Sequence, residues 1–310
     1  MKEKLTPYLK NLSGLPAIAA QYLATTAEPN ACDLEYDDPL LEDEHEVVKG
    51  LVHKYPNRAL IKVSYQCAAH CRFCTRIRQI GTNAGNLTAT DVSSIMEYLT
   101  RHPEIDDVIL SGGDPLYSPG ITTQLLEQLR HIPSVNVLRI GTRLPLQLPG
   151  AFQRNTIKEL LSLIDETGKK KPFFILLHVN HPDELTTEAM DVIKLLRQLR
   201  VTLLSQTVFL KGINDEYDVL HDLYTRLYHA GVIPYYLYHC DDVNGIGHFA
   251  GDIAKETAIA TRLTATLSGI ACPTYIIDIK NGHGKIPVPL NFISDRKNTI
   301  DFNGKMHEYH

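Results

Sequence analysis

The sequence predicts an α/β fold: a partial (β/α)6 barrel resembling an incomplete TIM barrel, preceded by a short helical N-terminal segment. Two observations support this prediction. Apolar, β-branched runs recur along the chain, and segments with a helical spacing of apolar residues separate them. Such alternation favours parallel strands joined by right-handed crossovers. Because six strand–helix units are too few for a closed eight-stranded barrel, an open partial barrel or a doubly wound sheet remains.

The predicted strands and helices alternate in order along the chain. The runs expected to form strands are residues 59–65, 107–110, 136–140, 173–179, 201–209 and 233–238. The segments expected to form helices are residues 90–99, 122–129, 156–164, 188–199, 217–227 and 255–267. Each predicted helix therefore follows a predicted strand, as a barrel built from repeated units requires.

The two ends of the chain differ from this core. We expect residues 1–55 to form a helical preface with short helices, because prolines interrupt it. A seventh β-like run at residues 274–277 precedes a glycine-rich loop, and we expect these to form a C-terminal flap over the barrel mouth. The predicted division is thus residues 1–55, 56–272 and 273–310.

Polar residues gather directly after the predicted strands. The first strand is followed by a loop with three cysteines, and the second by Ser111-Gly112-Gly113-Asp114-Pro115. The later strands lead into polar groups at residues 141–143, 178–181, 205–206 and 238–242. The carboxyl ends of parallel strands form the active face of such folds. We therefore expect one site at that face.

The cysteine loop has the spacing of an iron–sulfur site. Cys67, Cys71 and Cys74 form a C-x3-C-x2-C string, which can hold three corners of a [4Fe-4S] cube and leave the fourth iron open to a small molecule. Zinc is the alternative, with His70 as a fourth ligand, although zinc usually takes paired cysteines that lie far apart in sequence. A disulfide framework is disfavoured, because the chain has only 6 cysteines and no secretory leader.

Composition excludes several other classes of function. Apolar residues make up 44% and charged residues 22% of the 310 residues, which is usual for a globular protein. The net charge of −5 and pI of about 6.3 predict no basic face for nucleic acid. The chain shows neither a signal peptide nor an apolar run of membrane-spanning length, so we expect a cytoplasmic protein with no membrane partner.

Seven short strings of the sequence match motifs of a known family: residues 55–58, 71–76, 111–114, 139–143, 180–182, 234–236 and 278–285. Together they resemble radical S-adenosylmethionine enzymes, and more narrowly the lysine 2,3-aminomutase family. The resemblance covers roughly residues 40 to 310, and its motifs are specific only in combination. It implies an isomerase that moves an α-amino group to the β-carbon of an amino acid. The implied partners are a small-molecule amino acid and an electron donor such as flavodoxin or ferredoxin; assembly as a homodimer is left open.

The resemblance implies a first cofactor pair, a [4Fe-4S] cluster on the three cysteines and S-adenosylmethionine on its open iron. Reduction of that complex yields a 5′-deoxyadenosyl radical, and the protein orients and shields it. Asp114 resembles the position that contacts the methionine amino group. Gln206 and His178 match positions near the adenosine. Without the cysteine loop, Asp114 would be interpreted as part of an ordinary strand-to-helix turn.

A second cofactor, pyridoxal 5′-phosphate, is implied by the C-terminal match. Lys285 resembles the lysine that carries this cofactor as a Schiff base, although a lysine in a glycine-rich loop is usually a solvated surface residue. Tyr55 and Arg58 resemble the group that binds its phosphate, and Lys54 adds a further charge. His283 departs from the plainer glycine run that the family shows here.

The substrate is implied by three charged residues. Arg76 matches the position that holds the substrate α-carboxylate, a group suited to a planar guanidinium. Asp241 and Asp278 match the aspartates that bind the distal ammonium of lysine, with Asp242 as an adjacent competitor for the first role. Two buried carboxylates without a cation would be costly, so together they require a cationic ligand.

Two substrates remain open within this family. The Cys74-Thr75-Arg76 and Tyr238–Asp241 strings resemble enzymes of free amino acids, which favours L-lysine. The short N-terminus and residues 38–41 resemble the branch that acts on a lysine attached to elongation factor P. No cysteine follows Cys272, so we expect none of the structural zinc sites that free-lysine enzymes carry. A non-catalytic iron–sulfur or zinc protein is the remaining alternative.

Overall fold

The computed structural model describes residues 2–26, 28, 38–279, 281–292, 298–300 and 305–308. Contacts divide the chain into two compact units. Unit 1 contains Met1–Thr25, Leu41–His178 and Glu184–Leu204, and unit 2 contains Thr26–Leu40, Val179–Asp183 and Ser205–His310. Parts of the predicted helical preface, residues 1, 27 and 29–37, lie outside the described residues, as do residues 280, 293–297, 301–304 and 309–310 of the predicted C-terminal segment.

Unit 1 begins with two short helices, α1 (Pro7–Leu12) and α2 (Pro16–Tyr22). Each begins with a proline, which is favoured at the first helical position because it has no amide hydrogen to leave unpaired. Leu9, Ile18 and Tyr22 are buried in one cluster with Ala69, which lies inside the cysteine loop. The short helices predicted for this region are confirmed here, and they form part of the support of the cysteine loop.

Two strands in the same region were not predicted. β1 (Glu46–Val48) and β2 (Leu51–Tyr55) form an antiparallel pair joined through Gly50, whose φ of 83° is the left-handed conformation that glycine tolerates. The prolines of this segment predict short helices, and strands as short as β1 and β2 carry too little period-two pattern to be predicted. As a result, Tyr55 lies on a strand, next to a turn.

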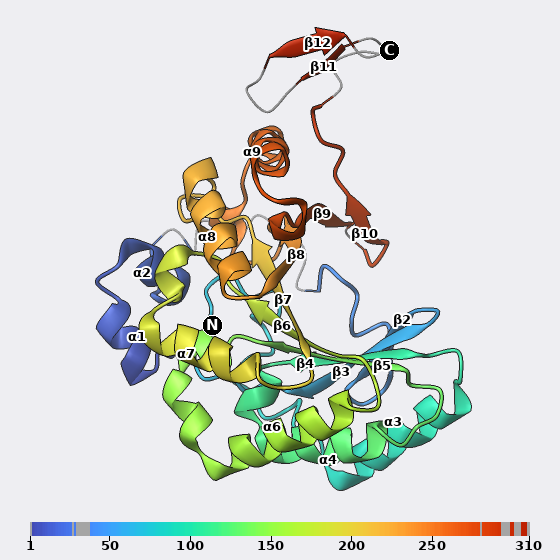
Figure 1. Cartoon of the computed structure of the whole chain (residues 1–310). Helices are drawn as coiled ribbons and strands as arrows, with labels where there is room; N and C mark the ends of the chain where they lie inside the picture. The colour runs from blue at the N-terminus through green and yellow to red at the C-terminus, as the bar shows by residue number, and fades with distance from the viewer. Residues whose placement is uncertain are drawn as a thin grey trace. The chain divides into compact units, whose positions relative to one another are not determined.

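The barrel strands of unit 1 are β3 (Arg58–Ser64), β4 (Asp107–Gly112), β5 (Val137–Thr142) and β6 (Phe173–His178), all paired in parallel. β2 adds to β3 in antiparallel fashion. The helices are α3 (Ala89–Arg101), α4 (Pro119–Leu129), α5 (Leu144–Gln147), α6 (Asn155–Gly168) and α7 (Thr187–Leu196). Figure 1 shows α3, α4 and α6 along the same side of these strands.

Unit 2 has its own strands and helices. β8 (Ile233–Tyr238) pairs in parallel with β9 (Thr274–Ile279), and β10 (Gly284–Pro287) pairs antiparallel with β9. The helices are α8 (Tyr217–His229) and α9 (Ile253–Thr266), and β11 (Asn298–Ile300) pairs with β12 (Met306–Glu308). β7 (Thr202–Val208) is divided between the units after Leu204.

The strand order confirms the predicted open partial barrel. Strands β1 to β10 pair in the order of the chain, and the sheet is not closed. A doubly wound sheet would reverse its strand order at a switch point, and no reversal occurs among the described strands. Within the described ranges, no helix combines the length and apolar character needed to cross a membrane.

Gly113 provides a test of how the loop after β4 supports the cysteine loop. Its amide donates to the Ser64 carbonyl at 2.5 Å, and a Cβ added there would overlap backbone atoms of Gln66, the neighbour of Cys67. Gly113→Ala should therefore displace this loop, lower the free energy of unfolding by about 1–3 kcal/mol and reduce iron content after reconstitution. Urea unfolding and iron quantification measure both effects.

Gly141→Ala is the matched control, because a Cβ at Gly141 would meet nothing within 4 Å. It should keep the iron content of the unsubstituted protein. If Gly113→Ala matched it in stability and iron content, the proposed support would be wrong.

Candidate active site

The cysteine loop of unit 1 follows β3 and is held by the N-terminal residues. The Lys4 ammonium donates to the Cys67 carbonyl at 2.6 Å, and the His70 amide donates to the Lys4 carbonyl at 2.9 Å. The Arg72 amide donates to the carbonyl of Gln21 in α2 at 2.8 Å. Because the loop has no regular secondary structure, these hydrogen bonds and the α1–α2 cluster determine its shape.

The three thiols are close enough to affect one another. Burial raises the pKa of the Cys67, Cys71 and Cys74 thiols, that of Cys74 to about 11, and the charge of neighbouring thiolates raises the pKa of Cys67 and Cys74 further. A bound metal deprotonates a coordinating thiol, so iron would supply the charge that these thiolates need. In the part of the chain that the structure describes, no three His, Cys, Asp or Glu side chains gather around one ion position. A cube places each thiolate on a different iron, so its cysteines need not meet at one point.

Arg143, which had no predicted role, contacts the cysteine loop. Its guanidinium donates to the Cys71 sulfur at 3.5 Å and to Gln21 Oε1 at 3.1 Å, and it forms a buried ion pair with Glu184. The carbon at its centre lies 5.0 Å from the Phe73 ring centroid. Its place directly after the third predicted strand was the signal that could have identified it. The cation partly offsets the effect of burial on the pKa of Cys71.

Asp114 joins the loops that follow β4 and β5. Its carboxylate is buried and accepts hydrogen bonds from the Thr142 hydroxyl at 2.8 and 2.9 Å, the Arg143 amide at 2.8 Å and the Leu116 amide at 3.0 Å. Burial raises its pKa, and its charge raises the pKa of Cys67, so it lies near that thiol. The structure therefore gives Asp114 a positioning role, and contact with S-adenosylmethionine stays a prediction.

Arg76 already holds a carboxylate of the chain itself. Its Nε donates to Glu42 Oε2 at 2.7 Å and its Nη2 donates to Glu42 Oε1 at 2.5 Å, a two-point arrangement typical of arginine and carboxylate. Nη1 donates to the Gly112 carbonyl at 3.3 Å. The neighbouring guanidinium holds the pKa of buried Glu42 below its usual value. The geometry fits carboxylate recognition, and a substrate at this position has to displace Glu42, which the sequence gave no reason to single out.

Tyr55 and Arg58 face each other across the β2–β3 turn. They are register partners, and the Arg58 guanidinium lies 3.9 Å from the Tyr55 ring centroid. The Tyr55 hydroxyl is buried and has no hydrogen-bond partner among the residues that the structure describes. A donor without a partner beside a guanidinium suits an oxyanion such as phosphate. His178 ends β6, and its ring centroid lies 5.5 Å from that of Phe73 in the cysteine loop.

Unit 2 brings Lys285, Asp278 and Asp241 together. Lys285 lies on β10 directly opposite Asp278 on β9, and the two side chains form an ion pair. Lys285 is thus a strand residue, whereas the sequence placed it on a loop. Its ammonium lies 5.5 Å from the Tyr238 ring centroid and remains partly exposed, whereas Asp278 is buried and its Oδ1 has no hydrogen-bond partner within the described part of the chain. Burial, reinforced by the charge of Asp278, raises the pKa of Asp241 to about 7.

Gln206 lies on β7 in unit 2 and is half-buried. Its carbonyl accepts a hydrogen bond from the Val179 amide at 3.0 Å, directly after the end of β6. The structure therefore assigns it a backbone role in strand pairing, and a side-chain contact with adenosine stays a prediction.

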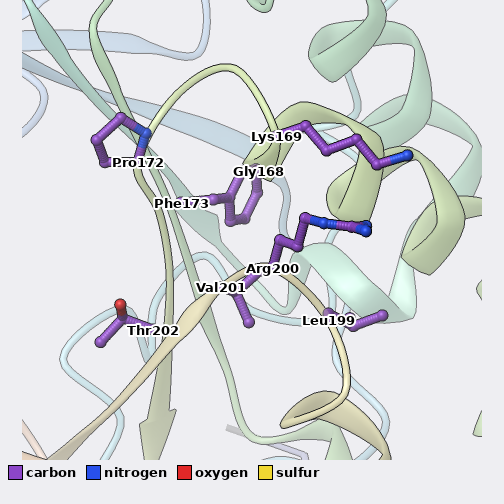
Figure 2. Close-up of a pocket in the computed structure, with 8 residues that line it drawn as sticks. All are labelled: Gly168, Lys169, Pro172, Phe173, Leu199, Arg200, Val201 and Thr202. Carbon is purple, nitrogen blue, oxygen red and sulfur yellow. The ribbon is translucent and has the colours of Figure 1, made fainter.

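A pocket elsewhere in unit 1 is not part of this site. It has a volume of about 570 Å³ and lies at the amino ends of β6 and β7, opposite the ends that carry the predicted residues. Figure 2 shows the Lys169 and Arg200 side chains at this pocket, and these cations are paired with Glu166 and Asp165. None of the residues that line it was predicted to act in catalysis.

Comparison with known proteins agrees with this arrangement. The profile of the Radical SAM superfamily matches residues 61–223, more than half of the chain. The fold is also that of a radical SAM methyltransferase from Sphaerobacter thermophilus, with a TM-score of 0.51 and 17% identity over 75% of this chain and 69% of that one. The chain is a radical SAM enzyme, and its superfamily implies a [4Fe-4S] cluster and S-adenosylmethionine.

Similarity to curated proteins identifies the family within the radical SAM superfamily. L-lysine 2,3-aminomutase from Methanococcus maripaludis is 35% identical over 98% of this chain and 71% of its own length. The enzymes of that name from Clostridium subterminale and Escherichia coli strain K12 are 35% and 36% identical over 94% and 82% of this chain, and over 70% and 72% of their own lengths. The chain belongs to the lysine 2,3-aminomutase family, and it is an isomerase.

The Arg143–Glu184 pair yields a prediction about stability. Arg143→Leu removes the cation that is paired with the buried Glu184 carboxylate, which should lower the free energy of unfolding by about 3–5 kcal/mol. The double variant Arg143→Leu/Glu184→Leu removes both charges of the pair and should regain most of that loss, as measured by urea unfolding. Equal losses in the single and double variants would contradict this assignment. Iron content should stay reduced in both variants, because both lack the donor to Cys71.

Proposed function

We propose that this isomerase is a 2,3-aminomutase that moves the α-amino group of a free cationic amino acid, with L-lysine as the first candidate, to the β-carbon. The observation that carries the proposal is the ion pair of Lys285 with buried Asp278, together with the half-buried carboxylate of Asp241 beside it. The names of the curated relatives support the same substrate.

The charges of this cluster favour a cationic substrate. Asp278 pairs with Lys285, and its Oδ1 has no partner among the described residues, while burial and the charge of Asp278 raise the pKa of Asp241 to about 7. A second ammonium bound between the two carboxylates would offset their repulsion and replace the hydration that burial removes. An uncharged amino acid of the same length offers no such compensation. The distal ammonium of lysine is the group that this cluster fits.

Pyridoxal phosphate fits the same cluster and belongs to the proposal. When bound, it supplies an aldehyde that takes up an amine and a conjugated ring that delocalises an unpaired electron. Lys285 would hold it, since its amine is partly exposed on β10. Tyr55 and Arg58 would hold its phosphate, because they offer a hydroxyl without a partner and a guanidinium.

The remaining roles follow the charges of the side chains. Arg76 would orient the substrate α-carboxylate by taking it in place of Glu42. Asp114, His178 and Gln206 would position S-adenosylmethionine on the cluster held by the three cysteines. An electron donor such as flavodoxin or ferredoxin would supply the electron, and exclusion of water would protect the carbon radical from side reactions.

Product analysis tests the proposal. The reconstituted, reduced protein is incubated without oxygen with S-adenosylmethionine, pyridoxal phosphate and, in turn, lysine, arginine, ornithine and glutamate. Chromatography should show a β-amino acid from lysine at the highest rate. If none of the four amino acids yielded a β-amino acid, the proposal would be wrong. Modification of elongation factor P carrying an α-lysyl group, together with inert free lysine, would assign the protein-bound substrate.

Two single substitutions separate the two cofactors. Lys285→Ala should abolish the visible absorbance of bound pyridoxal phosphate and keep the iron content, because the cysteines are intact. Cys71→Ala should do the reverse, because a cube with two protein ligands is poorly held. Absorbance spectra measure the bound pyridoxal phosphate, and iron quantification measures the cluster. If Lys285→Ala kept the absorbance, the assignment of this lysine would be wrong.

A further inference from the structure

A hydrogen-bonded network of three side chains lies beside the Asp241 cluster. His239, at the end of β8, Glu256 in the first turn of α9, and Tyr275 on β9 meet inside unit 2. His239 Nδ1 lies 2.7 Å from Glu256 Oε2, and the Tyr275 hydroxyl donates to the same oxygen at 2.6 Å. Because an ionised carboxylate only accepts, His239 donates its Nδ1 hydrogen to Glu256.

The Glu256 carboxylate depends on this contact. The residue is 1% exposed, and its other oxygen, Oε1, has no hydrogen-bond partner. A charge buried in this way is costly unless a cation faces it, and His239 lies closest. In turn, Glu256 raises the pKa of His239, although burial acts in the opposite direction. The hydrogen bond from His239 to Glu256 thus favours the protonated form of the imidazole ring.

The protonated imidazole ring acts on Asp241, two residues along the chain. Charges face Asp241 from several elements: Asp278 on β9, Lys285 on β10, and His239 and Asp242 on either side of it in the chain. Lys285 and His239 lower its pKa, and the two aspartates raise it. When Lys285 is occupied by pyridoxal phosphate, His239 is the remaining cation among these groups.

We propose that Glu256 is a positioning residue, which holds His239 as a cation so that Asp241 stays ionised and binds the distal ammonium of the substrate. This inference rests on the proposed function and deepens it, because it assigns substrate affinity to two residues that do not touch the substrate. Their effect acts through the charge of Asp241.

The ionisation of Asp241 determines in which direction Glu256→Gln shifts the pH dependence. Asp241 binds an ammonium only when ionised, a form that is present above its pKa and lost as the pH falls through it. Glu256→Gln keeps the shape of the side chain and removes the charge that raises the pKa of His239, so the protonated form of His239 is less favoured. The pKa of Asp241 then rises, and the acidic limb of kcat/KM for L-lysine moves to higher pH.

The experiment is the pH profile of kcat and KM for L-lysine with reconstituted enzyme. The pKa of Asp241 is about 7 in the unsubstituted protein, so a rise of about half a unit to one unit in Glu256→Gln should raise KM at pH 7 about twofold to fivefold, with a smaller change in kcat. Glu256→Asp retains the charge and should keep the acidic limb near that of the unsubstituted enzyme. The double variant His239→Gln/Glu256→Gln should shift the limb no further than Glu256→Gln alone, because the pair acts as one unit.

Tyr275→Phe is the matched control, since it removes a hydrogen bond to the same oxygen and leaves both charges. It should lower Tm without moving the acidic limb. If Glu256→Gln failed to fold, His239→Gln, at a side chain that is 17% exposed, would carry the test, because it removes the same cation. An unmoved limb in the folded variant overturns this inference, while the proposed function stands if the unsubstituted enzyme still converts lysine. An unsubstituted enzyme that converts no amino acid overturns the proposed function itself.

Discussion

Charged side chains among the candidate residues form pairs of opposite charge, and at least one member of each pair is buried. In unit 1, Arg143 pairs with Glu184 beside the cysteine loop, and Arg76 pairs with Glu42. In unit 2, Lys285 pairs with Asp278 and His239 with Glu256. A buried pair contributes little net stability, but the loss of one member is costly. Removal of one member of such a pair therefore leaves a charge that another group of the same sign as the lost member has to balance.

Parallel pairing explains how unit 1 gathers its functional groups. β3, β4, β5 and β6 run in the same direction, so the loops after them lie at the same edge. That edge carries the three cysteines after β3, Asp114 after β4, Arg143 after β5 and His178 at the end of β6. Asp114 then ties two of these loops through Thr142 and the Arg143 amide. Gly113, directly after β4, lets that loop approach Gln66, next to the first cysteine.

Periodicity and family resemblance predicted much of this from sequence, and the misses have physical reasons. The barrel strands and helices were found because their apolar spacing extends over several residues, although α7 ends at Leu196 and not at residue 199. β1 and β2 were missed because short strands beside prolines carry little pattern. Glu42, Glu184 and Glu256 could not be chosen from sequence, because an acidic residue gains its role only from the cation that it meets in the fold. Lys285 was identified by motif, but its pairing with Asp278 across a hairpin depends on strand register.

Transfer of deuterium would test whether the cysteine loop and Lys285 serve one reaction on one molecule. The reconstituted enzyme is supplied with S-adenosylmethionine carrying deuterium at the 5′ carbon, and the β-amino acid formed from L-lysine is analysed by mass spectrometry. Under the proposed function, deuterium should appear in the product, because the adenosyl radical takes a hydrogen from the amino acid and the adenosyl carbon then returns one. A β-amino acid free of deuterium after many turnovers would show that the two groups do not act on the same substrate.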